Sequence, residues 1–91
     1  MLTPKYHGSF KKDYKLAQKR GKDMDKITEV INLIINEQPF PSKHKKHPLH
    51  GDYTGWWECH IEGDWLLVYR IDKDNQRVIF YRTGTHSDLF Q

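Results

Sequence analysis

Histidine is frequent in this basic chain of 91 residues, and two of its six histidines stand where phosphate chemistry could be carried out. His60 lies four residues before Asp64, at the point where one strand-like run gives way to the next. His86 follows a third strand-like run and a Gly, almost at the C-terminus, so we expect its side chain at an exposed rim of a sheet. Neutral imidazole and imidazolium coexist near pH 7, so two such groups can supply a base and an acid.

The spacing of His60 and Asp64 predicts a pair, because a tight reversal at Glu62-Gly63 could bring the two side chains together. A carboxylate beside an imidazole fixes its tautomer and favours its protonated form, which suits a general acid. His47, which precedes Pro48 in a basic loop, is equally consistent with a functional and a structural role. The remaining histidines are expected at the surface, solvated or touching a partner; these are His7, His44 and His50.

Metal, cofactor and nucleophile templates are weak in this sequence. There is no HExxH, and the lone Cys59 cannot build a Cys-rich zinc site and is expected to be a small buried hydrophobe. His44-x-x-His47-x-x-His50 could bind a metal opportunistically, but we expect neither a native metal site nor a cofactor. No Gly-rich phosphate loop and no GxSxG occur either.

Positive charge is concentrated in two stretches, although the formal net charge is only +3. One is the run of eight positions from Lys43 to His50, which includes Lys45 and Lys46 and holds no acid, and the other contains the lysines between positions 11 and 22. Such tracts attract polyanions but also occur on ordinary solvated faces. Arg82 could stabilise charge on a transferring phosphoryl group, and Phe90 could either close the core or stack on a nucleobase.

Length and composition predict one domain, residues 1–91, whose core depends on aromatic side chains. No apolar run approaches the roughly 20 residues that span a bilayer, and the N-terminus has no signal-peptide pattern. A single Cys is compatible with a reducing compartment. We therefore expect a cytoplasmic protein that does not associate with membranes.

The periodicities predict an α+β fold, with a helical hairpin packed on one face of a small antiparallel sheet. Ser9 is expected to cap a helix that begins at Phe10 and ends at Gly21, and Asp23 a second helix with an Ile/Val face. The middle strand is apolar at four consecutive positions, which is typical of a central strand covered on both sides. The expected strands are 56–61, 65–71 and 77–83, with a short extended segment over 2–6.

Four segments together resemble the YafQ-type branch of the RelE/ParE toxin superfamily, the ribosome-dependent mRNA interferases of bacterial type II toxin–antitoxin systems. The two most specific are His60-x-x-x-Asp64-Trp65 with Leu67-x-Tyr69, and Arg82-Thr-Gly-Thr-His86 continuing to Leu89-Phe90. The others are the helix segment 15–24 and His47-Pro-Leu-His-Gly51. The match runs nearly from end to end.

This resemblance implies a compact RelE-like, microbial-ribonuclease-like fold and metal-independent cleavage of mRNA in the ribosomal A site. It places the catalytic set at His47, His60, Asp64 and His86. A base would help the ribose 2′-OH attack the adjacent phosphate, and an acid would protonate the leaving 5′-oxygen, leaving a 2′,3′-cyclic phosphate. His86 is expected to be the acid and His60 or Asp64 the base, while His47 holds substrate. The substrate-binding set comprises Phe90, Arg82, Trp65, Lys45 and Lys46.

The partners that the resemblance implies are the ribosome with its mRNA and a cognate antitoxin, whose C-terminal segment would wrap the toxin and cover its basic surface. Two alternatives stay open. One is a non-catalytic RNA- or ribosome-binding module, which would use the same basic surface without cleavage. The other is the gyrase-poisoning branch of the same superfamily.

Overall fold

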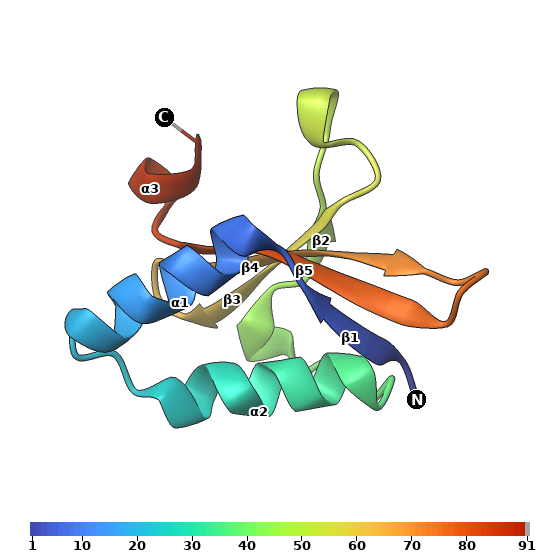
Figure 1. Cartoon of the computed structure of the whole chain (residues 1–91), viewed down its shortest axis with the longest axis horizontal. Helices are drawn as coiled ribbons and strands as arrows, with labels where there is room; N and C mark the ends of the chain where they lie inside the picture. The colour runs from blue at the N-terminus through green and yellow to red at the C-terminus, as the bar shows by residue number, and fades with distance from the viewer. Residues whose placement is uncertain (91) are drawn as a thin grey trace.

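The computed structural model describes residues 1–90 as a five-stranded sheet with two long helices and one short one (Figure 1). In chain order the elements are β1 (Thr3–Tyr6), α1 (Gly8–Lys19), α2 (Met24–Ile35), the 3-10 turn η1 (Ser42–His44), β2 (His47–Pro48), the 3-10 turn η2 (Gly51–Tyr53), β3 (Trp57–Glu62), β4 (Trp65–Asp72), β5 (Arg77–Gly84) and α3 (His86–Phe90).

The sheet has the order β1-β5-β4-β3-β2 and is mixed. β2 to β5 pair antiparallel, as expected from the tight links between the last three strands, and β1, whose direction was not predicted, pairs parallel with β5. The direction of β1 is set by no hairpin, because α1 and the rest of the chain lie between it and its partner. Pro4 is tolerated there because β1 is an edge strand.

The two long helices form as their sequence patterns predict, with one difference at a cap. Asp23 caps α2, accepting a hydrogen bond from the backbone N–H of Asp25 at 3.1 Å. The first helix begins two residues earlier than expected, because His7 and not Ser9 is its N-cap and accepts from the Ser9 N–H at 3.2 Å. No helix within residues 1–90 is long and apolar enough to cross a membrane.

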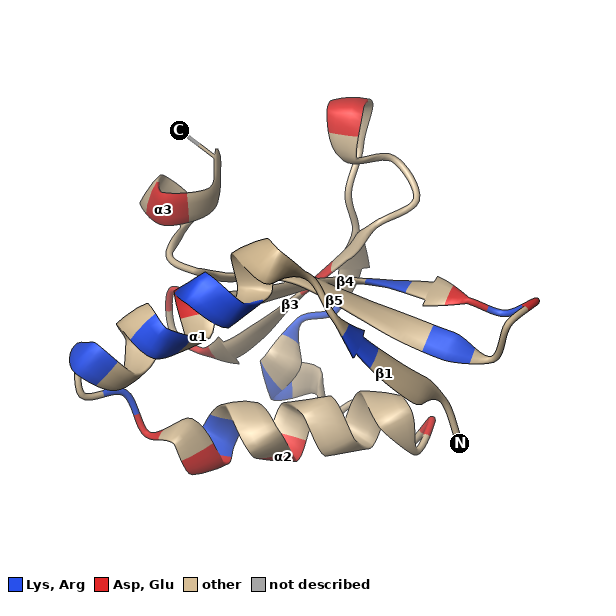
Figure 2. Ribbon diagram, in the orientation of Figure 1, with Lys and Arg blue, Asp and Glu red and all other residues tan. Residues whose placement is uncertain are grey.

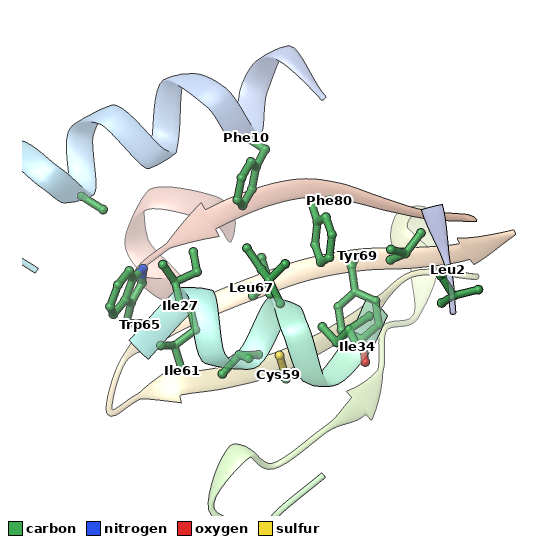
Figure 3. Packing of buried hydrophobic residues seen from close by; sticks show 14 residues of the cluster. Leu2, Phe10, Ile27, Ile34, Cys59, Ile61, Trp65, Leu67, Tyr69 and Phe80 are labelled. Carbon is green, nitrogen blue, oxygen red and sulfur yellow. The ribbon is translucent and has the colours of Figure 1, made fainter. Parts of the chain in front are cut away.

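The sheet separates two hydrophobic clusters. The larger one packs α1 and α2 against one sheet face, where Leu67 and Tyr69 of β4 meet Ile27 of α2 and Phe10 of α1 (Figure 3). The smaller one, on the other face, holds Leu66 and Val68 under Leu89 of α3. β4 is therefore central and covered on both sides, as its uninterrupted apolar run predicted.

Two short elements that the sequence analysis did not predict frame this second face. β2 pairs with the edge of β3, and the chain then rises through η2 (Figure 1). α3 turns upward after β5 on the same side, opposite to α2 (Figure 1). Between α3 and β2 lies the face of β3 and β4 that is opposite to α2.

Candidate active site

The alternation of β3 divides its side chains between the core and the open face of the sheet. Cys59 and Ile61 point into the larger cluster, so Glu58 and His60 lie on the opposite side. There they pair across from Val68 and Leu66, which belong to the smaller cluster. Burial raises the pKa of the Cys59 thiol to about 12, so this side chain is the inert hydrophobe that was predicted.

Glu58 is the centre of this face. Its side chain is only 3% exposed, yet one oxygen, Oε1, lies close to the Nε2 atoms of three imidazoles. The distances are 3.1 Å to His47, 3.8 Å to His60 and 3.8 Å to His86. β2 brings in the first of these because His47 is the cross-strand partner of Glu58. Three histidines from β2, β3 and α3 thus converge on one buried carboxylate.

His86 is oriented by Asp64. The Asp64 Oδ1 atom accepts hydrogen bonds from the His86 ring Nδ1 at 2.6 Å and from the His86 backbone N–H at 3.2 Å. These two bonds, together with the nearby His86 and His60 charges, hold the pKa of the Asp64 carboxyl below its ordinary value. The link joins the β3–β4 turn to the start of α3, which are 22 residues apart in the sequence.

The predicted pairing of His60 with Asp64 was therefore wrong in its partner. The β3–β4 turn directs the His60 ring to the Gly63 carbonyl, which accepts a hydrogen bond from Nδ1 at 2.9 Å. Gly63 has φ +54°, a conformation that suits this tight reversal. With Nδ1 as the donor, the Nε2 atom of neutral His60 carries the free lone pair.

The third imidazole meets an acceptor at each nitrogen. His47 Nε2 faces Glu58 at 3.1 Å, and its Nδ1 lies 3.3 Å from the Pro48 carbonyl oxygen. Both ring nitrogens of His47 are thus engaged within the protein, Nε2 by a carboxylate and Nδ1 by a carbonyl.

α3 is tied to the rest of the chain by Asp88. Arg20 donates to both carboxylate oxygens of Asp88, at 2.8 and 3.4 Å, and the Thr85 backbone N–H donates to it at 3.0 Å. These contacts lower the pKa of Asp88 to about 2. Gly84 precedes the helix with φ +157°, and an added Cβ there would come within 3.0 Å of Asp88. The position of His86 thus depends on contacts outside the histidine cluster.

Phe90 lies at the surface, 37% exposed, and does not close the core. Its ring meets that of Tyr53 edge-on, with centroids 5.4 Å apart, and stands 6.2 Å from the His86 ring. An exposed aromatic face beside the three imidazoles is placed to stack on a base. Leu89, the residue before it, closes the smaller hydrophobic cluster instead.

Two of the residues predicted to bind substrate are engaged elsewhere. Trp65 is 2% exposed and donates from its indole N–H to the Thr83 hydroxyl at 3.0 Å, so the expectation that it touches substrate is corrected: it is a core residue. Arg82 donates to Asp13 of α1 at 2.6 and 3.3 Å, and this ion pair raises its pKa. The guanidinium fastens α1 to β5, and a contact with phosphate would have to compete with Asp13.

In the basic stretch from Lys43 to His50, one side chain that was expected at the surface is buried. His44 is 4% exposed, not solvated, because its Nδ1 lies 2.7 Å from the His60 carbonyl oxygen behind the site. Lys43, Lys45 and Lys46 are all exposed, and the Lys46 ammonium lies over the Trp57 ring, 4.7 Å from its centroid. Figure 2 shows further Lys and Arg positions along α1. Positive charge therefore borders the molecule on more than one side.

The burial of His44 also separates it from the metal trio suggested by the spacing 44, 47 and 50. Within residues 1–90, the group whose donor atoms come close enough to hold a metal ion is His47, Glu58 and His60, with these atoms within 4.8 Å of one another. Two imidazoles and a carboxylate suit a transition-metal ion. Of these three residues, His60 is also a candidate for acid–base chemistry.

Glu58 is the site residue that the sequence analysis missed. A signal was present, since Glu58 and His60 are two residues apart in a strand and so share one of its faces. What the sequence could not provide was the two-residue strand β2, which places His47 opposite it.

Comparison with known proteins agrees with this fold. A family model described as a bacterial toxin of type II toxin–antitoxin system, YafQ, matches residues 2–91. The mRNA interferase toxin YafQ of Escherichia coli K12 is 46% identical over 86 residues, which cover 93% of this chain and 91% of the relative. The putative toxin YafQ of Haemophilus influenzae is 30% identical over 91 residues, or 94% and 89% of the two chains.

Solved structures give the same result. The crystal structure of YafQ from Escherichia coli BL21(DE3) superposes with a TM-score of 0.92 at 41% identity over all of both chains. YafQ in the Escherichia coli DinJ–YafQ complex gives 0.90 at 42%, again over all of both chains. A metal-bound toxin from Helicobacter pylori gives 0.94 at 40%, covering 99% of this chain and 100% of that one.

The fold and the relatives together define a small α+β toxin of the RelE-like class, as the sequence resemblance had indicated. Within that class, the chain belongs to the YafQ family of bacterial toxins from type II toxin–antitoxin systems.

Proposed function

We propose that this toxin is a ribosome-dependent endoribonuclease that cleaves mRNA by attack of the ribose 2′-OH on the adjacent phosphate, and that it needs no metal ion to do so. The observation that carries the proposal is the convergence of His47, His60 and His86 on one open face beside an exposed aromatic ring, Phe90. Its relatives from Escherichia coli bear the name mRNA interferase.

His86 is the general acid in this proposal. Its Nδ1–H is bound by Asp64 at 2.6 Å, which leaves Nε2 as the atom that can deliver a proton to the leaving 5′-oxygen. The carboxylate then stabilises the imidazolium form of the ring before transfer. Asp64 therefore orients His86 and acts on the reaction only through this ring.

His60 is the general base, in preference to Asp64. The Asp64 oxygen that faces the site already accepts two hydrogen bonds, and its lowered pKa makes it a weak proton acceptor. His60, by contrast, presents Nε2 while Gly63 binds Nδ1. His47 holds the phosphate between base and acid, and Phe90 stacks on a neighbouring base. Lys45 and Lys46 are proposed to contact RNA, while Arg82 contacts it only if it leaves Asp13.

The proposed partners are the ribosome with its mRNA, in the bacterial cytoplasm, and an antitoxin. An antitoxin is supported by the family to which the chain belongs and by the DinJ–YafQ complexes among its structural relatives. A segment that folds on this basic toxin would bury charge and cover the histidine face.

Primer extension on a defined mRNA in a translating extract tests this function. The cuts are expected to require ribosomes, to be made equally well by toxin stripped with EDTA and desalted before it is added to the Mg²⁺-containing extract, and to disappear in His86→Ala. Ribosome binding without cuts in the wild-type protein would instead identify a non-catalytic binding module. Cuts that are lost with the EDTA-stripped toxin and restored when a transition-metal ion is returned to it would overturn metal independence.

A further inference from the structure

The catalytic histidines surround a carboxylate to which the family resemblance gave no role. Glu58 is a β3 residue with 3% exposure, and burying a carboxylate is costly unless charge or hydrogen bonds compensate it. Its neighbour at hydrogen-bond distance is His47 Nε2, at 3.1 Å. The two other imidazoles complete the surroundings of the same oxygen at 3.8 Å each.

The three rings follow the same hydrogen-bond pattern. In each of them Nδ1 is taken by an oxygen on the outside of the cluster: the Pro48 carbonyl for His47, the Gly63 carbonyl for His60 and Asp64 for His86. In each ring Nε2 is thus the nitrogen near Glu58 Oε1, but only His47 is within hydrogen-bond distance, and at 3.8 Å the Nε2 atoms of His60 and His86 stay available to substrate. A single anion at the meeting point of three Nε2 atoms explains why separate strands and turns present the same ring atom.

From this geometry we infer that Glu58 is the positioning residue of the active site, which orients His47 and supplies the fixed negative charge that compensates protonated imidazole during the reaction. The inference rests on the proposed function and deepens it. Glu58 does not touch the substrate, because its side chain is buried beneath the rings.

The negative charge of Glu58 would act in both proton transfers of the proposed reaction. When His60 takes the 2′-OH proton, a cation forms 3.8 Å from the carboxylate, and the Coulomb attraction favours that transfer. When His86 gives up its proton, the opposite change occurs at an equal distance from the same oxygen. The sum of charge around Glu58 is thus the same before and after the two transfers, which spares the buried carboxylate an uncompensated state.

Two substitutions of Glu58 separate the effect of its charge from the effect of its side-chain length. Glu58→Gln keeps an acceptor of the same size but removes the charge, and Glu58→Asp keeps the charge on a side chain shorter by one methylene. Single-turnover cleavage at saturating ribosomes is expected to slow by about 100-fold in Glu58→Gln. Ribosome affinity should stay within about 3-fold, since Glu58 lies below the contact surface. Glu58→Asp should recover part of the rate.

Glu62→Gln is the matched control, because Glu62 is on the same strand but is exposed and pairs with Lys26 rather than with a histidine. Thermal unfolding of each variant shows whether the fold is retained. A Glu58→Gln protein that is folded and cleaves at the wild-type rate would overturn the inference, as would a loss explained wholly by weaker ribosome binding.

A second readout does not depend on cleavage. The ring ¹⁵N spectrum of the wild-type toxin should show protonated Nε2 for His47, and protonated Nδ1 for His60 and His86. In Glu58→Gln the His47 ring signals should move, while in Glu62→Gln they should stay. Unchanged His47 signals in a folded Glu58→Gln variant contradict the inference. Absence of cleavage in wild type would refute the proposed function while this spectrum still tests Glu58.

Discussion

Replacing Asp64 by Asn isolates the contribution of one carboxylate to the acid of the reaction. Asn can keep one acceptor for the His86 ring or backbone, but it loses the charge that stabilises the imidazolium form. Removing a proton-transfer group entirely costs about 10²- to 10⁴-fold in rate. The side chains of Asp64 and His86 are 58% and 57% exposed, so water screens part of the lost charge. We therefore expect a loss of about 10- to 100-fold.

The assay is single-turnover cleavage of an mRNA codon in the A site of purified ribosomes, with His86→Ala beside Asp64→Asn. His86→Ala should be the slower of the two, because it lacks the acid itself. Asp74→Asn, in the β4–β5 turn, is the control for removal of an exposed carboxylate. If Asp64→Asn cleaves as fast as wild type, or more slowly than His86→Ala, the assignment of Asp64 as the group that orients His86 is refuted.

Three further predictions concern other parts of the molecule. Phe90→Ala should weaken mRNA binding by the roughly 1–3 kcal/mol of a lost base stack, with Phe90→Trp close to wild type when KM is measured; equal KM values would contradict stacking. Arg20 lowers the pKa of Asp88 to about 2. Ionised Asp88 therefore stabilises the folded state fully above the ordinary aspartate pKa of about 4, and this stabilisation is lost as the pH falls toward 2. Arg20→Ala should therefore move acid unfolding, followed by circular dichroism, to higher pH, and an unmoved midpoint would refute the pairing. Cys59, with a pKa of about 12, should resist iodoacetamide at pH 8 until the protein is unfolded, and rapid labelling of native protein would show that it is not buried.

The helices and the long strands could be predicted because their local signals agree with the final packing. The Ile/Val face of α2, including Ile27 and Ile34, is buried as its period requires. The apolar run Leu66 to Tyr69 identified the central strand. The direction of β1 could not be predicted in this way, because a parallel pair has no short turn to mark it.

The sequence predicted which residues lie at the site better than it predicted which of them contact one another. His47, His60, Asp64, His86 and Phe90 do lie on one face, where the resemblance placed them together. Their catalytic roles remain predictions. The partner of each ring depends on the register at the β3–β4 turn and on α3, which are tertiary features that sequence spacing does not encode.

Arg82 and Trp65 make contacts within the protein that the sequence did not indicate. Both sit in the most specific sequence segments, yet their side chains serve the interior: one binds Asp13 and the other Thr83. A motif residue can be retained for packing that supports a site as well as for contact with substrate. Only the structure distinguishes these two uses.

The most direct test of the central claim is the fate of a single hydroxyl. An mRNA with a 2′-deoxyribose at the cleaved nucleotide should bind in the A site but remain uncut by the wild-type toxin. The matched all-ribose mRNA should be cut by toxin that was stripped with EDTA beforehand, and the product should end in a 2′,3′-cyclic phosphate, detected by mass spectrometry. Cleavage of the deoxy-substituted mRNA at the same position, or a product with a 3′-hydroxyl, would contradict attack by the 2′-OH and with it the acid–base roles of His60 and His86.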